Sequence, residues 1–429
     1  MKKLSKITAF LLIFLMMFAV KAGAIVDKNT INIAIKDTVN EIMTRKPEPA
    51  FGDEWNIIAL ARSGENIPQS YYDTYYKSVE QKVLNESKKV VPFTPDFDKE
   101  DWTGVNDLER TIITLNAIGK DPQNVNGINL VNMIFNRENL ADENGVSGLT
   151  YALISIDTKN YPEIPGAINT RDSIIKDMLA LRTKDGGFSW DSNAAEADLD
   201  TTAMAIQALY KYIDRSEVKE AVDRGLEILK SKQSEEGDYI GHYMNYTYES
   251  PCTAAQVVVA LDNLKMNPID ASNGFVKKKD LIDVMMSYYI NRGGFKNSSD
   301  EISPNPIATQ QILYSLDSYK RLLEGKNTLY DMTDVATKKA EQPVQTNNNS
   351  EKDRPEIKTS AVENGQQPTN SNSVDADANK NVNTEVNEVK KDDESAVVNT
   401  GDTLSYTICV IAIISGLIVF RSRLIRKEA

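Results

Sequence analysis

The sequence has a single histidine, His242, and only two cysteines, Cys252 and Cys409, among its 429 residues. One imidazole excludes sites built from several histidines, such as HExxH metalloproteases and multi-histidine zinc centres. A Ser-His-Asp triad would have to use His242, and no nucleophile-elbow motif accompanies it. Two cysteines are too few for a disulfide framework. The chain therefore lacks the residues of several common catalytic centres.

Positive charge is also scarce, because 49 Lys and Arg residues face 62 Asp and Glu residues and leave a net charge of -13. Proteins that bind DNA or RNA gain much of their affinity by neutralising phosphates. We therefore expect no nucleic-acid partner. The hydrophobic content of 41% over this length is enough to bury a large core.

The first residues have the order of a secretory signal peptide. Lys2, Lys3 and Lys6 precede an apolar run over residues 7–20, and small residues follow up to Ala24. This order predicts a signal peptide over residues 1–24, cut after Ala24. An uncleaved membrane anchor is the alternative, but the run is shorter than the about 20 apolar residues that a span needs.

The last residues predict an anchor. An apolar run over residues 404–420 is followed by a basic tail, which predicts a membrane span with a cytoplasmic end. With Thr400-Gly401 ahead of it, this order resembles the cell-wall sorting signal of Gram-positive bacteria, although Val397-Val398 replaces the usual Leu-Pro. The resemblance implies that sortase cuts between Thr400 and Gly401 and joins the threonine to peptidoglycan. A retained membrane span is the alternative, and either places residues 25–330 outside the cell.

Residues 331–400 are rich in Asn, Lys, Glu, Asp, Ser and Thr and contain no aromatic residue and no leucine. Such a segment cannot bury enough apolar surface to offset its ordering entropy, so we expect a disordered stalk. The predicted organisation is a signal peptide (1–24), a folded domain (25–330), a stalk (331–400) and a sorting signal (401–429).

Helical periodicity repeats through residues 25–330. Thr201–Leu209 carries small residues at helical spacing, which form a surface that lets another helix approach closely. Stretches of the same kind are Trp55–Leu60, Arg110–Leu115, Gly148–Leu153, Thr253–Leu261 and Thr309–Leu316. More amphipathic stretches lie near them, at Thr30–Thr44, Ser70–Leu84, Gly127–Phe135, Arg171–Leu181, Glu217–Lys232 and Lys277–Ile290. The alternation predicts an inner ring of helices inside an outer ring.

The loops between these helices repeat a glycine-aromatic sequence. It occurs in Arg182–Phe188 and in Arg292–Phe295, where glycine permits a tight reversal and the aromatic ring plugs the base of a hairpin. These features resemble the prenyltransferase/squalene-cyclase repeat of terpene cyclases, protein prenyltransferase β subunits and vitamin B12 carriers. Residues 51–64 also resemble secreted Gram-positive members of this family. The resemblance implies an all-α fold, an α6/α6 toroid, but no particular activity.

One motif resembles the acid of class II terpene cyclases. Residues 198–203 read Asp-Leu-Asp-Thr-Thr-Ala, close to an Asp-x-Asp-Asp-Thr-Ala motif whose middle aspartate protonates an alkene. The resemblance implies Asp200 as the acid, but Thr201 replaces the fourth motif residue. Trp190 and Tyr151 could line a mouth, and we expect no stacked aromatic set on the inner helices. The simpler expectation is that Asp200 caps its helix, and acid catalysis is the alternative.

The zinc site of protein prenyltransferases is incomplete here. That site uses Asp, Cys and His, and Cys252 does open a predicted inner helix. However, Ser250 stands where the aspartate is expected, and His242 lies in the preceding loop. The acidic loop over residues 185–191 lacks regular calcium-ligand spacing. We therefore expect no metal and no cofactor.

A tyrosine-rich loop offers a candidate surface for a ligand. Clustered tyrosines near a toroid mouth can stack on sugars, corrins or peptides, although they can equally fill the core. A complete corrin clamp would need a partner, since no strand-like segment follows residue 330. The candidate ligand-binding residues are Trp190, Asp198, Asp200, Tyr243, Tyr246 and Tyr248.

The predicted function is ligand binding by a non-catalytic, surface-anchored toroid, with a corrinoid, a glycan or a peptide as the ligand. Two alternatives remain at this point. The first is a secreted terpene-cyclase-like enzyme with Asp200 as its acid. The second is a structural or adhesive protein of the cell wall.

Overall fold

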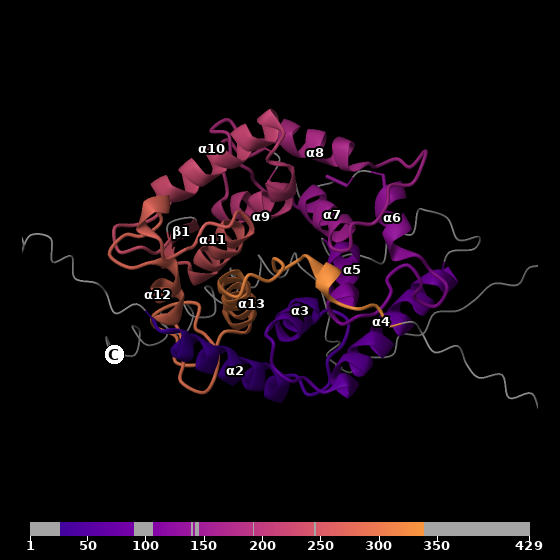
Figure 1. Ribbon diagram of the computed structural model, residues 1–429, viewed down its shortest axis with the longest axis horizontal. Helices are drawn as coiled ribbons and strands as arrows, with labels where there is room; N and C mark the ends of the chain where they lie inside the picture. The colour runs from indigo at the N-terminus through magenta and orange to yellow at the C-terminus, as the bar shows by residue number, and fades with distance from the viewer. Residues whose placement is uncertain are drawn as a thin grey trace, which may run out of the picture. The chain divides into compact units, whose positions relative to one another are not determined.

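The computed structural model describes residues 26–89, 106–138, 140–141, 146–191, 193–243 and 246–338. The predicted signal peptide, the Thr400-Gly401 pair, the apolar run 404–420 and most of the stalk lie outside these residues. Within them the chain is mostly helical and forms two concentric rings (Figure 1). Among the described helices, none is long and apolar enough to cross a membrane.

Six of the described helices form the inner ring. They are α3 (Glu54–Arg62), α5 (Asp107–Ala117), α7 (Ser147–Asp157), α9 (Leu199–Leu209), α11 (Pro251–Asn263) and α13 (Pro306–Leu323). Each packs against the next inner helix of the chain, and α13 packs against α3, which closes the ring. Small side chains allow the close packing, since Ala203, Ala205, Ala254 and Ala255 are fully buried.

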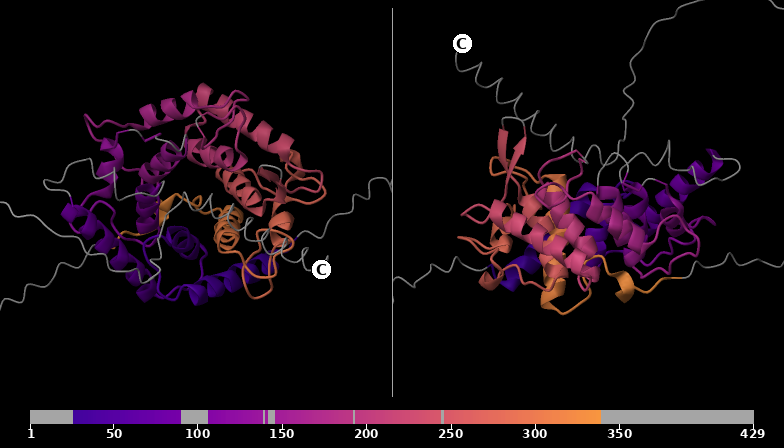
Figure 2. Two further views of the ribbon diagram at one scale, coloured as in Figure 1. Left: turned by 180° about the vertical axis from the view of Figure 1, so that it is seen from behind. Right: turned by 90° about the horizontal axis from the view of Figure 1, so that it is seen from above.

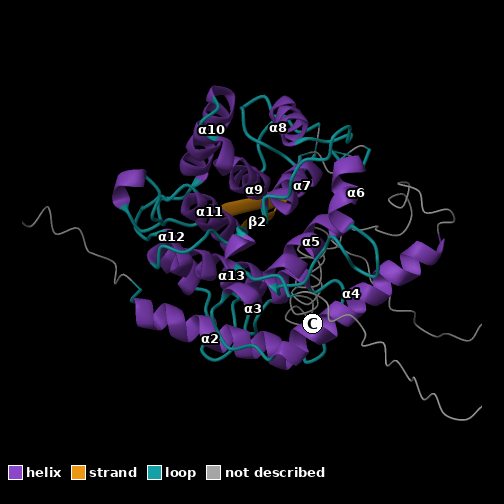
Figure 3. Cartoon of the chain, turned by 45° about the vertical axis from the view of Figure 1, so that its right-hand side comes forward, coloured by secondary structure: helices purple, strands orange, loops and turns teal. Residues whose placement is uncertain are grey.

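The outer ring comes from helices that alternate with the inner ones along the chain (Figure 3). They are α2 (Lys28–Arg45), α4 (Gln69–Lys89), α6 (Leu130–Asn136), α8 (Arg171–Ala180), α10 (Ser216–Lys232) and α12 (Leu281–Met286). Helix α10 has the predicted amphipathic pattern: Val218, Ala221 and Leu229 are buried, while Lys219 and Asp223 form an exposed ion pair of 2.6 Å. The described helices thus have the α/α-toroid arrangement that the sequence predicts.

Helix α12 is shorter than the predicted segment Lys277–Ile290. Asp280 caps it by accepting a hydrogen bond of 2.8 Å from the Asp283 N–H, so the helix begins only at Leu281. The Lys278 and Lys279 N–H groups instead donate to backbone carbonyls of the loop at residues 235–236. The amphipathic pattern correctly predicted a helix here, but the predicted helix extends beyond the observed one at both ends.

A short antiparallel hairpin departs from the all-α prediction. Strands β1 (Ile240–Tyr243) and β2 (Tyr246–Glu249) pair in the loop between α10 and α11. The hairpin projects from one end of the helical rings (Figure 2). The tyrosine-rich segment that we predicted as a loop is therefore a paired structure.

The glycine-aromatic loops behave as predicted. Phe188 and Phe295 are fully buried, and each exchanges two hydrogen bonds with a threonine of the following inner helix. Thr202 Oγ1 accepts from the Phe188 N–H and donates to the Phe188 carbonyl, and Thr309 does the same with Phe295. At Gly294, with φ of 79°, a Cβ would lie 2.8 Å from Thr309 Oγ1. The loop therefore requires glycine for its backbone and for its packing.

The chain after α13 crosses one end of the inner ring. Met332 lies in a short 3-10 helix, η4 (Met332–Asp334), and is fully buried. Its N–H donates to the Thr158 carbonyl at 2.8 Å, and Thr158 Oγ1 donates to the Tyr330 carbonyl at 2.6 Å. The packed part of the chain therefore continues past Asp331, where we predicted the stalk to begin.

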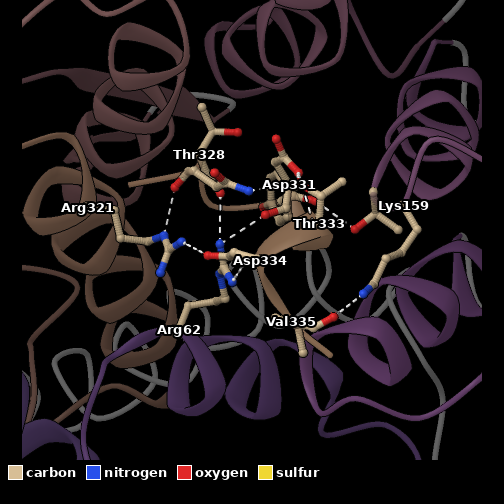
Figure 4. A network of polar contacts seen from close by, with 11 residues as sticks. Arg62, Lys159, Arg321, Thr328, Asp331, Thr333, Asp334 and Val335 are labelled. Atoms are coloured by element: carbon tan, nitrogen blue, oxygen red, sulfur yellow. Dashed lines mark hydrogen bonds and ion pairs between the residues drawn. The ribbon is translucent and has the colours of Figure 1, made fainter. Parts of the chain in front are cut away.

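Charged side chains hold this segment in place (Figure 4). Arg62 is 4% exposed, and its guanidinium pairs with Asp334 at 2.9 Å and donates to the Thr328 and Asp331 carbonyls at 3.0 and 3.1 Å. Arg321 forms a second ion pair with Asp334. We call residues 326–338 the seal, because they cover the end of the ring at which the inner helices finish.

Candidate functional site

The inner helices all run in the same direction through the ring. Arg62 and Arg321, at the ends of α3 and α13, contact the seal, and so do Thr158 after α7 and Tyr210 after α9. The carboxyl ends of four inner helices therefore meet at the seal, and the amino ends of these helices meet at the opposite end. We call that opposite end the mouth.

Helix α9 begins at the mouth, and its cap is Asp198. Its Oδ1 accepts hydrogen bonds from the Thr201 N–H at 2.8 Å and from Thr201 Oγ1 at 2.6 Å. The prediction that Asp200 caps this helix is therefore wrong. The backbone turns into the helix two residues earlier than we assumed, so Asp200 lies within the first turn.

Asp200 lacks the hydrogen bonds that a buried carboxylate normally makes. Its Oδ1 is buried and has no partner among the described residues. Burial raises the pKa of Asp200 to about 7, the neighbouring Asp198 carboxylate adds to the rise, and the Thr253 hydroxyl opposes it. Burial also raises the pKa of Asp198. At neutral pH a large fraction of Asp200 is therefore protonated and can donate a hydrogen bond.

Three inner helices contribute an aromatic cluster. The Trp55 ring lies 5.3 Å from the Tyr151 ring and 6.1 Å from the Tyr314 ring, in tilted contacts. The Tyr151 hydroxyl donates to Met204 Sδ at 2.9 Å, and Met204 lies one turn after Asp200 on α9. The aromatic cluster therefore lies against the same face of α9 as Asp200. We expected no stacked aromatic set on the inner helices; these rings are tilted rather than stacked, and the sequence did not predict their contact.

Glutamines fill the ring next to the aromatic cluster. Gln207 Nε2 donates to the Gln256 carbonyl at 2.9 Å and to Gln256 Oε1 at 3.0 Å. Gln256 Nε2 donates to Gln311 Oε1 at 3.3 Å and to the Tyr314 hydroxyl. These hydrogen bonds link neighbouring inner helices, although Gln207 Oε1 is buried with no partner among the described residues.

The other predicted ligand residues lie on loops and on the hairpin. Trp190 is on the loop that leads into α9 and is 46% exposed. Tyr243 and Tyr246 are paired residues of the hairpin, and Tyr248 lies on β2 opposite Gly241. Of the six candidates, the structure places Asp198 and Asp200 together. Binding by the other four stays a prediction.

Cys252 begins α11 at the mouth and is 7% exposed. Its Sγ lies 3.4 Å from Asn297 Oδ1, at donor distance. In the part of the chain that the structure describes, no three His, Cys, Asp or Glu residues group closely enough to hold a metal ion. Cys252 therefore lies here as a small buried side chain with a polar neighbour.

Comparisons with known proteins add little. No family model matches the sequence, and no curated protein matches it. Among solved structures, the chain is similar to the unsaturated glucuronyl hydrolase of Bacillus sp. GL1, responsible for the degradation of glycosaminoglycan. The identity is 13%, the match covers 70% of this chain and 97% of that chain, and the TM-score is 0.44. A similarity this low does not bear on the function of this chain.

Proposed function

We propose that this protein is a ligand-binding toroid displayed outside a Gram-positive cell, which holds a glycan at the mouth without transforming it. The observation that carries the proposal is Asp200. Its Oδ1 is buried without a partner among the described residues, and it shares a face of α9 with the aromatic cluster of Trp55, Tyr151 and Tyr314. A buried polar atom left unsatisfied costs about 1–3 kcal/mol, a cost that a ligand group could remove.

A glycan suits this combination of groups. Sugar rings have an apolar C–H face that packs on aromatic side chains and hydroxyl edges that donate and accept hydrogen bonds. A carboxyl group with a pKa of about 7 offers both a donor and an acceptor near neutral pH. A carboxylate that stayed ionised at neutral pH would bind cations in preference to neutral sugars.

The seal supports entry from the mouth. Arg62, Arg321 and Met332 close the opposite end of the ring through ion pairs, hydrogen bonds and burial. A ligand that reaches Asp200 would then come from the side where the hairpin projects.

The binding test uses the full-length chain and an array of neutral oligosaccharides. Asp200→Ala should weaken binding of any hit at least about tenfold, the equivalent of about 1.4 kcal/mol. Asp200→Asn should retain most of the affinity, because its amide also donates and accepts. Asp223→Asn on the exposed face of α10 is the matched control. Absence of any oligosaccharide hit would reject the glycan, and equal binding by the Asp200→Ala variant would reject the site.

Display on the cell wall rests on the predicted sorting signal and has its own test. Thr400→Ala should abolish covalent attachment, since sortase would lose the residue that it joins to peptidoglycan. Cell fractionation with detergent extraction measures the attachment. A variant that stays in the peptidoglycan fraction would contradict the sortase proposal, and the membrane span over residues 404–420 would become the anchor.

Acid catalysis by Asp200 is the second candidate, and the raised pKa of this residue favours it over a purely structural role. Protonation of an alkene, however, requires an unusually strong acid, and a raised pKa makes a carboxyl group a weaker one. Asp200→Asn separates the two functions. If the wild type converts a polyprene and this variant binds it without conversion, the protein is an enzyme.

A further inference from the structure

A cavity lies beside the hairpin, and neither Asp200 nor the aromatic cluster lines it. Its volume is about 390 Å³, within the range of about 300–1,000 Å³ typical of ligand pockets. Glu236 and Asp238 line it from the loop before the hairpin, Glu249 lines it from β2, and Tyr288 lines it from the turn after α12. Several parts of the fold that are distant in sequence therefore build it.

Backbone contacts make the walls rigid. The Lys278 and Lys279 N–H groups donate to the Glu235 and Glu236 carbonyls at 3.2 and 3.1 Å. Gly237 has φ of 107°, and a Cβ there would lie 2.5 Å from the Lys279 carbonyl oxygen. The loop at residues 235–237 and the segment at residues 278–279 are therefore in direct contact, and each supports the other at the cavity.

Two of the three carboxylates that line the cavity, Asp238 and Glu249, have neutral hydrogen-bond partners. Glu249 Oε2 accepts from the Ser299 N–H at 3.0 Å, and Asp238 accepts from the Ser234 hydroxyl. Burial and the nearby carboxylates of Glu249 and Asp238 raise the pKa of Tyr288. Among the described residues, neither Glu249 nor Asp238 forms an ion pair, so two negative charges converge on one tyrosine without a cation.

The two lysines that line the cavity, Lys279 and Lys296, have no carboxylate partner among the described residues. Lys296 Nζ donates to the Ser299 carbonyl at 3.1 Å, and Lys279 also lines the cavity. Neither lysine forms an ion pair with any residue in the described ranges, whereas the adjacent Lys278 pairs with Glu236. Among the described residues, two lysines and two carboxylates therefore line the same space without forming ion pairs with one another.

We propose that this cavity binds a short zwitterionic peptide, with its ammonium group at Glu249 and Asp238 and its carboxylate at Lys279 and Lys296. Charge-assisted hydrogen bonds at both ends would give orientation as well as affinity. The volume accommodates more than a single amino acid. The proposed site shares no residue with Asp200 or the aromatic cluster and does not depend on the glycan.

The experiment is calorimetric titration of the full-length chain with trialanine, acetylated trialanine and trialanine amide. Trialanine should bind, and blocking either terminus should weaken binding at least about tenfold, because each block removes one charge-assisted contact. Glu249→Gln and Lys296→Gln should each have a similar effect. The Glu249→Gln variant keeps an oxygen that can accept from Ser299, so the wall should stay intact.

Matched controls come from exposed ion pairs elsewhere. Glu227→Gln, whose wild-type side chain pairs with Arg224, and Lys326→Gln, whose wild-type side chain pairs with Glu324, should bind trialanine like the wild type, and so should Asp200→Asn. No binding of trialanine, or equal binding of the blocked peptides, would overturn the proposal. An equal loss in the control variants would also overturn it, because the effect would then come from net charge rather than from the cavity.

Discussion

Two ionisable side chains at opposite ends of the inner ring, Arg62 and Asp200, differ in how their buried polar atoms are satisfied. At the seal, the Arg62 guanidinium has a carboxylate and two carbonyl oxygens as partners. At the mouth, Asp200 has a buried oxygen with no partner among the described residues. A satisfied network stabilises one structure, whereas an unsatisfied group costs stability and is expected where a ligand completes it. This contrast is why we place recognition at the mouth.

Removing the guanidinium should break the seal and have the largest effect on stability. Arg62→Met removes one of the two cations that pair with Asp334, which keeps Arg321, and leaves two carbonyls without their donor; loss of one partner from a buried pair costs about 3–5 kcal/mol. Because Asp334 is 33% exposed, we expect a value near about 3 kcal/mol. Urea unfolding measures this change in the free energy of unfolding. Arg215→Met, which breaks an exposed pair with Asp172, should cost at most about 1 kcal/mol. Equal costs would refute the structural role of the seal.

Asp317, near the seal, is one of several buried groups at that end with unpartnered atoms among the described residues, and it limits the comparison to Arg62 and Asp200. It is fully buried, neither carboxylate oxygen has a hydrogen-bond partner in the described part of the chain, and burial raises its pKa. A carboxyl group with a raised pKa contributes stability that is full below its unfolded pKa and is lost as the pH rises. Asp317→Asn should therefore stabilise the chain more at pH 8 than at pH 5, by about 1.4 kcal/mol for each unit by which the folded-state pKa exceeds 5, up to pH 8. Thermal unfolding of both proteins at pH 5 and pH 8 tests this prediction. If the stability difference between the variant and the wild type is the same at both pH values, Asp317 is not protonated in the folded state.

At the mouth, the two aspartates should respond differently. Asp198→Ala removes the cap of α9 and should cost about 0.5–2 kcal/mol. Asp200→Asn at pH 5 should change stability by less than about 0.5 kcal/mol, because the protonated carboxyl and the amide are both neutral. Denaturant unfolding at pH 5 compares them. A larger cost for Asp200→Asn would mean that Asp200 stabilises the helix after all.

The sequence predicts the rings well because their signals are local. Small residues at helical spacing identify inner helices such as α9, and glycine-aromatic loops predict the contacts of Phe188 and Phe295. The mouth was harder to predict. The cap depends on whether the backbone turns at Asp198 or Asp200, a shift of two residues that the motif does not decide. The contact of Trp55 with Tyr151 and Tyr314 depends on how three helices are rotated about their axes, and this rotation is set by packing between segments far apart in the chain.

The most direct test of the account is the pKa of the Asp200 side chain, measured by a carbon-detected NMR titration of the full-length chain. The Asp200→Asn variant assigns the signal. We predict titration near pH 7, because the group is buried beside Asp198 and lacks a partner for Oδ1. Titration near pH 4, the usual range of an aspartate, would show that Asp200 is solvated or paired, and the contrast between the mouth and the seal would no longer hold.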